Sequence, residues 1–154
     1  MVKIKVPGTS ANIGPGYDTL GLALNIFNEI TVEKKKSGIE ILWDIPNPNI
    51  PLEENLVYVA LIHTLKKYKK EHLGCTIRMT KVDVPISRGL GSSAAAIVCG
   101  IYAAHYLMDY ALSTKEISQM VGLSYTPTYE RIKYLEESGV IRGRVTVLEP
   151  KKVG

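Results

Sequence analysis

Cysteine, long apolar runs and an obvious leader are scarce or missing in this sequence. Cys75 and Cys99 are its only cysteines, and neither stands in a CxxC or Cys/His spacing, which excludes a disulfide framework. No apolar run approaches the roughly 20 residues of a membrane span, and no basic-then-apolar stretch opens the chain. We therefore expect a cytoplasmic protein with two buried thiols and no membrane partner.

A strong charge of either sign is also missing. The 154 residues carry 19 Lys and Arg against 15 Asp and Glu, a net charge of +4, and the excess is spread along the chain. This supports a polyanionic partner only weakly. A hydrophobic fraction of 45% is enough for a normal core, so we expect one domain, or one domain with a small appendage.

The apolar patterning predicts strands and helices in the same domain, which is an α+β fold. Period-two alternation indicates strands and recurrence at three and four indicates helices. A KKKSG turn between two strand patterns predicts a hairpin, and Asn55 is the expected cap of a helix that stops at Gly74. The expected strands are 2–6, 29–34, 38–43 and 76–82, and the expected helices are 56–73 and a buried 94–110.

The stretch PISRGLGSSAA, residues 85–95, predicts an anion site. Gly89 and Gly91 allow backbone N–H groups to approach a ligand, and a helix beginning at the serines adds free amides and a favourable dipole. Ser92 and Ser93 can cap that helix, or give hydroxyls to phosphate or Mg²⁺. The stretch is neither GxxxxGK[ST] nor GxGxxG, so a glycine-rich turn with serine caps remains the alternative.

Together, VPGTSANIGPGYDTLGLAL and PISRGLGSSAAA resemble the two motifs of the GHMP small-molecule kinases, and the first is most similar to its homoserine kinase form. The resemblance covers residues 1–112 and implies a ribosomal-S5-type GHMP kinase N-terminal domain that uses ATP and Mg²⁺. Asn12 and Asp18 match positions that contact an amino-acid substrate; a local Asx-turn and a turn cap are the alternatives. The implied ATP-binding residues are Pro85, Ile86, Ser87, Arg88, Gly89, Leu90, Gly91, Ser92, Ser93, Ala94, Ala95 and Asn55, with Ser92 and Ser93 also near the metal.

The match to these kinases stops before their next motif. An acidic Mg²⁺ ligand in an EGHPDN-like segment, and substrate-binding arginines in a second domain, are expected after the buried helix. The chain instead continues STKEISQMVGLSYTPTYERIKYLEESGVIRGRVTVLEPKKVG. Phosphoryl transfer depends on positioning and on charge neutralisation, so we expect impaired catalysis and assign no catalytic residue.

Residues 113–154 have a different pattern, that of a winged helix-turn-helix. Ser113 and Glu116 form a capping box for a helix over 114–120, Gly122 permits a turn, and a second helix over 126–138 precedes a β-ribbon over 140–148. The pattern resembles the leucine-responsive (AsnC-type) transcription regulators, although their first helix and dimer-forming domain are not found. The resemblance implies major-groove or phosphate contacts by Tyr125, Thr126, Thr128 and Arg131, and DNA-backbone contacts by Lys133, Arg142 and Arg144.

Three hypotheses follow from a kinase-like part over 1–112 and a winged-helix-like part over 113–154. The first, which we favour, is an ATP-binding fragment of a homoserine kinase-type enzyme, with a small amino-acid substrate and impaired turnover. The second is a DNA-binding regulator with weak affinity for duplex DNA. The third is a chimera with neither activity.

Overall fold

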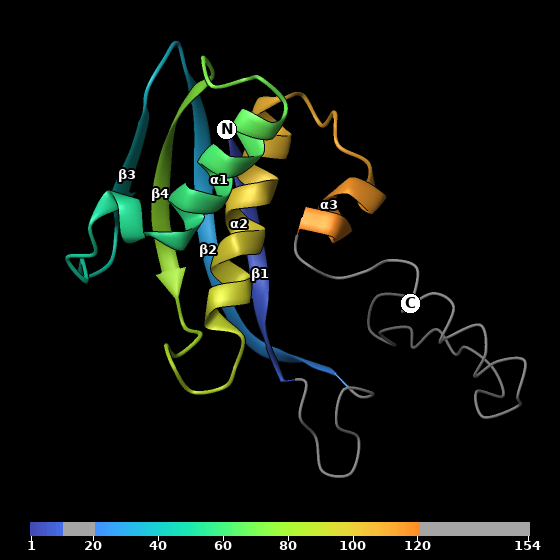
Figure 1. The fold of residues 1–154 in the computed structure, drawn as a ribbon. Helices are drawn as coiled ribbons and strands as arrows, with labels where there is room; N and C mark the ends of the chain where they lie inside the picture. Colours follow the sequence, from blue (N-terminus) through green and yellow to red (C-terminus); the bar gives the residue numbers. More distant parts are fainter. Residues whose placement is uncertain (11–20, 121–154) are drawn as a thin grey trace, which may run out of the picture.

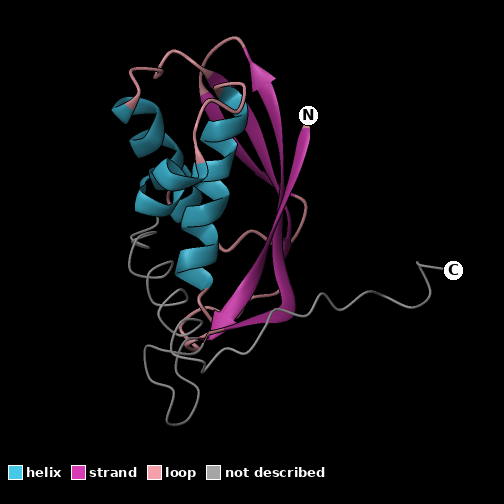
Figure 2. Ribbon diagram, turned by 90° about the vertical axis from the view of Figure 1, so that its right-hand side faces the viewer, coloured by secondary structure: helices cyan, strands magenta, loops and turns pink. Residues whose placement is uncertain are grey.

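The computed structural model describes residues 1–10 and 21–120. They form two layers, with helices covering one face of a four-stranded sheet (Figures 1 and 2). This confirms the expected α+β class, whereas residues 121–154 of the predicted winged helix lie outside the described part. No helix within the described ranges is long and apolar enough to cross a membrane. The elements are β1 (Val2–Ser10), β2 (Leu22–Lys35), β3 (Ile39–Trp43), the 3₁₀ turn η1 (Leu52–Glu54), α1 (Leu56–Lys67), β4 (Gly74–Val82), α2 (Ser92–Leu107) and α3 (Thr114–Met120).

The strands lie in the order β1-β2-β4-β3, with β4 antiparallel to β2 and parallel to β3. The predicted hairpin is therefore wrong, because β4 lies between the two strands that the KKKSG turn joins. Gly74, where β4 starts, allows this arrangement: a Cβ there would lie 2.6 Å from Ser37 Cα and 2.7 Å from the Gly38 carbonyl oxygen. The turn can cross the start of β4 only because residue 74 has no side chain.

Helix α1 begins where the sequence predicts and ends earlier. Asn55 Oδ1 accepts a hydrogen bond of 3.0 Å from the Val57 N–H, which is the expected N-cap. The predicted end at Gly74 is wrong, since the helix stops at Lys67. Lys69 adopts a left-handed φ of 55°, and the amides of residues 69 and 70 bond back to the last turn, closing a Schellman motif.

Helix α2 packs against both α1 and the sheet, as the sequence predicts for a buried helix. Its buried face closes over β1 and β2, while Tyr102 on the other face is 42% exposed. Burial raises the pKa of Cys75 to about 11 and that of Cys99 to about 12, so both thiols are structural, as expected. The core side chains include Ile30, Val32, Val57, Leu61, Leu65, Ile77, Cys99, Ala103 and Leu107.

Replacing Gly100 by alanine should destabilise the domain. A Cβ at this position would overlap the Val57 carbonyl oxygen and lie 2.8 Å from Ala60 Cβ, so α1 and α2 would have to separate. Overpacking of this kind costs about 1–3 kcal/mol, whereas alanine in place of a mid-helix glycine ordinarily stabilises by about 1 kcal/mol. Urea unfolding of the wild type and of Gly100→Ala measures the sign of the change in the free energy of unfolding. A more stable Gly100→Ala variant would show that the helices are not in close contact.

Helix α3 begins with the predicted capping box and is also joined to α1. Glu116 Oε2 accepts from the Ser113 N–H at 2.8 Å and from Ser113 Oγ at 2.6 Å, and the Glu116 N–H donates to Ser113 Oγ at 3.3 Å. The Tyr68 hydroxyl donates to Glu116 Oε1 at 2.9 Å. Ile117 and Met120 are half-buried against the core. One carboxylate therefore caps α3 and fastens it to the end of α1.

Stability should depend on Glu116 in acid. Hydrogen bonds from Ser113, first from its hydroxyl and then from its amide, and one from Tyr68 lower the pKa of this carboxyl from 4.5 to about 2. A lowered folded-state pKa stabilises the fold above the ordinary pKa and loses that effect as the pH falls through the folded value. The stability difference between wild type and Glu116→Gln should therefore shrink between pH 4.5 and about 2. Unfolding curves across this range measure it, and Gln at the exposed Glu71 is the control.

Candidate functional site

The glycine-rich loop between β4 and α2 is fastened to the sheet at both ends. At its start, the Val84 N–H donates to Asn28 Oδ1 on β2 at 3.2 Å. At its end, the Leu90 carbonyl accepts from the Thr9 N–H on β1 at 3.0 Å, next to an irregularity in the pairing of β1 with β2. The segment between these bonds is exposed. The loop is therefore held in one place and open to solvent.

Gly89 and Gly91, the two glycines of the loop, differ in what an added side chain would meet. Both have left-handed backbone, with φ of +71° at Gly89 and +70° at Gly91, a conformation that favours glycine. A Cβ on Gly89 would meet nothing within 4 Å, whereas one on Gly91 would overlap Thr9 Oγ1 and lie 3.3 Å from the Thr9 carbonyl oxygen. Gly91 is thus the position where the loop passes directly against β1.

The first turn of α2 has no side-chain cap. Gly91 occupies the N-cap position and the helix starts at Ser92, with no capping hydrogen bond, so the predicted capping role of Ser92 and Ser93 is wrong. The helical ladder begins with the Ala95 N–H, which donates to the Gly91 carbonyl at 2.8 Å. The amides before it have no partner in the helix, and with the helix dipole they favour an anion.

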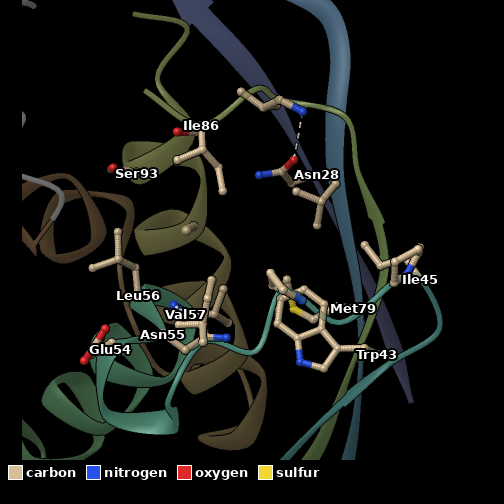
Figure 3. A pocket seen from close by; sticks show the side chains of 17 residues that line it. Asn28, Trp43, Ile45, Glu54, Asn55, Leu56, Val57, Met79, Ile86 and Ser93 are labelled. Carbon is tan, nitrogen blue, oxygen red and sulfur yellow. Dashed lines mark hydrogen bonds between the residues drawn. The ribbon is translucent and has the colours of Figure 1, made fainter. Parts of the chain in front are cut away.

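A cavity of about 360 Å³ opens beside this helix end. Figure 3 shows the cavity between the first turns of α1 and α2 on one side and the strands β2, β3 and β4 on the other. Most of its wall is apolar, and a few polar groups stand in it. The apolar residues are Trp43, Ile45, Pro46, Pro48, Ile50, Leu56, Val57, Met79, Val82, Val84, Ile86 and Ala96, and the polar ones are Asn28, Glu54, Asn55, Ser92 and Ser93.

The structure brings four of the predicted ATP-binding residues, from two distant stretches of chain, into the wall of this cavity. They are Ile86, Ser92 and Ser93 of the loop and Asn55 before α1. The other predicted residues of the loop lie outside the wall: Pro85, Ser87, Arg88, Gly89 and Ala94 are exposed, Leu90 and Gly91 lie half-buried, and Ala95 is buried.

The remaining predicted residues lie outside the described part of the chain. These are Asn12 and Asp18 for the substrate, and Tyr125, Thr126, Thr128, Arg131, Lys133, Arg142 and Arg144 for DNA. Their roles stay predictions.

Asn28, Trp43 and Met79 line the cavity and were not predicted. Trp43 and Met79 read as core residues in their strands, and nothing in their local sequence distinguishes a cavity wall from a core. Asn28 carried a usable signal: it is a polar residue on the same face of the strand as Ile30 and Val32, where period-two alternation expects an apolar one, and in the structure it is only 6% exposed. Buried amides in strands usually have a hydrogen-bonding task.

The described residues offer hydroxyls rather than a carboxylate cluster for a metal ion. Nowhere in 1–10 or 21–120 do three or more His, Cys, Asp or Glu side chains gather as a metal site would require. Ser92 and Ser93, at the open helix end, fit a role as hydroxyl ligands to a phosphate-bound Mg²⁺. Glu116 is already engaged by Ser113 and Tyr68.

Comparison with known proteins agrees with this geometry. Residues 55–126 match the family model for the GHMP kinases N terminal domain. The chain is 52% identical over 117 residues to homoserine kinase of Clostridium novyi, covering 76% of this chain and 39% of that protein. It is 42% identical over 117 residues to that of Clostridium acetobutylicum, covering 76% and 40%. The chain thus spans about two fifths of the length of these relatives.

Solved structures share the fold over the same part. Homoserine kinase from Cytophaga hutchinsonii superposes with a TM-score of 0.63 at 32% identity, covering 77% of this chain and 39% of that one. Mevalonate kinase from Methanococcus jannaschii gives a TM-score of 0.64 at 20% identity, covering 78% and 44%, which shows the fold alone. The described part of this chain therefore has the fold of a GHMP kinase N-terminal domain and is most similar to that of homoserine kinases.

Proposed function

We propose that this chain binds ATP, with the adenine in the apolar cavity and the phosphates at the start of α2. One observation carries the proposal: the cavity opens directly onto a helix end whose first amides have no cap. An apolar cavity favours a flat, neutral ring, and a free helix N-terminus favours phosphate. A nucleotide has both parts, joined by a ribose.

The polar residues of the cavity wall contact different parts of the nucleotide in this proposal. The hydroxyls of Ser92 and Ser93 stand beside the phosphates and fit either a phosphate oxygen or Mg²⁺. When bound, Mg²⁺ neutralises charge on the phosphates. Asn55 Oδ1 already accepts the hydrogen bond that caps α1, so we expect its NH₂ group to be the part that contacts the nucleotide.

We also propose the reaction that this domain serves when it is part of a chain as long as its relatives. That reaction is phosphoryl transfer from ATP to the hydroxyl of homoserine, a step of threonine biosynthesis. The support is the function of the relatives, which are homoserine kinases. Asn12 and Asp18 are the proposed contacts to the amino acid: a carboxylate can receive its ammonium group and an amide can hold its polar head.

Calorimetric titration with ADP and with ATP, each with and without Mg²⁺, tests the proposal. We expect both nucleotides to bind and to raise the melting temperature, and AMP to bind more weakly because it lacks the phosphates that reach the start of α2. Absence of any binding or thermal shift at millimolar nucleotide would refute the proposal. Equal affinity for AMP and ADP would refute the phosphate site at α2.

A further inference from the structure

Asn28 is one of three buried polar residues in the core of the described chain, with Asn55 and Thr64. The other two have local tasks: Asn55 caps α1, and the Thr64 hydroxyl donates to the Ala60 carbonyl at 2.7 Å. Asn28 instead lies in the middle of β2 and forms a wall of the cavity. Its neighbours in that wall are apolar, which makes its amide conspicuous.

The orientation of the Asn28 amide follows from its hydrogen bond. Since the Val84 N–H is a donor, the atom that receives it at 3.2 Å must be the side-chain oxygen, Oδ1. The NH₂ group is therefore on the other side, and in Figure 3 it points away from β2 into the cavity. The cavity thus presents a donor whose direction is fixed by the loop.

Resting on the proposed nucleotide site, we propose that Asn28 is a specificity-determining residue whose Nδ2 donates a hydrogen bond to a ring nitrogen of adenine. The helix end supplies amides for the phosphates, whereas Asn28 stands among Val82, Val84 and Met79, where a neutral acceptor costs far less to desolvate than a charged phosphate oxygen. A buried donor also discriminates strongly, because a base without an acceptor at that point leaves it unpaired.

Deaza analogues of ADP test which atom Asn28 reads. Adenine has ring-nitrogen acceptors at N1, N3 and N7, and 1-deaza-, 3-deaza- and 7-deaza-ADP each lack one of them. Titrated against the wild-type protein, one analogue should bind at least about tenfold more weakly than ADP, the scale of one hydrogen bond. The other two should bind within about threefold of ADP.

Two variants connect that preference to Asn28. Asn28→Asp keeps an acceptor for the Val84 N–H and removes the donor, and Asn28→Leu removes both. In each variant the ratio of ADP affinity to that of the discriminated analogue should fall to about one. This ratio cancels effects of added charge or of a shifted loop, because both ligands carry the same phosphates. Titration with inorganic tripolyphosphate, which has no base, shows separately whether the phosphate site survives.

The possible results separate this inference from the proposed function. If the wild type binds ADP and all three analogues equally, or if the preference persists in both variants, Asn28 does not read the base, although the nucleotide site stands. If the wild type binds no nucleotide at all, the proposed function fails and this inference fails with it. Asn28→Asp retains the bond to the loop, so the test does not depend on the folding of Asn28→Leu.

Discussion

Gly91→Ala should reduce ADP affinity by about 100-fold or more. The backbone of Gly91 has a left-handed φ of +70°, and an added Cβ would overlap Thr9 Oγ1. The left-handed conformation costs about 1–2 kcal/mol for a residue with a Cβ, and the overlap would push the loop and the first amides of α2 away from β1. Displacement of positioning groups by about 1 Å can cost about 10² in function. Calorimetry with ADP measures the loss.

Two other glycines are matched controls for this variant. Gly89, in the same loop, and Gly38, in the turn between β2 and β3, have φ of +71° and +76°, and a Cβ on either would meet nothing within 4 Å. Gly38→Ala should lower the melting temperature without changing ADP affinity, and Gly89→Ala should lose much less affinity than Gly91→Ala. If Gly91→Ala binds ADP as well as Gly38→Ala does, the loop is only a turn.

The sequence predicted the helices and strands better than it predicted which strands lie side by side. Apolar periodicity is local, so it found the helices, β3 and β4 and the first part of β1, but less than half of β2, which begins at Leu22 rather than at residue 29. The pairing of β3 depends on β4, which begins 36 residues after the end of the KKKSG turn, and no local pattern can report that insertion. The end of α1 was missed for a similar reason: Lys69 takes the left-handed conformation that is usually left to glycine.

The part of the site that one continuous stretch of sequence forms could be predicted. The loop over 85–95 carries its glycines and serines in one stretch, so its position and its open helix end could be inferred. The cavity wall comes from several elements, each contributing one or two side chains, and single residues such as Trp43 or Met79 have the same local pattern as a core. The bond between Asn28 and Val84 joins residues 56 apart in the chain, which only the fold brings together.

The boundary at residue 112 between the kinase-like part and the winged-helix-like part stays a prediction. The contacts of α3 favour keeping residues 113–120 with the kinase-like part, since Tyr68 bonds to Glu116 and Met120 packs against the core. The family match also runs to residue 126. Because a capping box begins many kinds of helix, the Ser113 and Glu116 pattern alone could not distinguish the two assignments.

The 154-residue chain on its own should phosphorylate homoserine at least about 10³-fold more slowly than a complete relative, or not at all. Phosphoryl transfer needs groups that hold the metal and neutralise charge in the transition state, and losing one such preorganised contact costs about 10²–10³ in rate. An assay of ADP release with ATP, Mg²⁺ and homoserine measures the rate, with Clostridium novyi homoserine kinase, 52% identical over the shared part, as the positive control.

Glu116→Gln provides a sharper version of the same test. If this chain turned over at the rate of the relative, some carboxylate would have to hold the metal, and Glu116 is an acidic residue that follows α2, after which the kinases are expected to carry their acidic Mg²⁺ ligand. In the structure, however, both of its oxygens already accept hydrogen bonds, from Ser113 and Tyr68, so recruiting it to a metal would release the start of α3. We therefore expect Glu116→Gln to lower the stability of the domain and to leave nucleotide affinity and any residual ADP release unchanged. Rapid turnover by the wild type that disappears in Glu116→Gln, with ADP affinity retained, would show instead that this carboxylate serves the reaction.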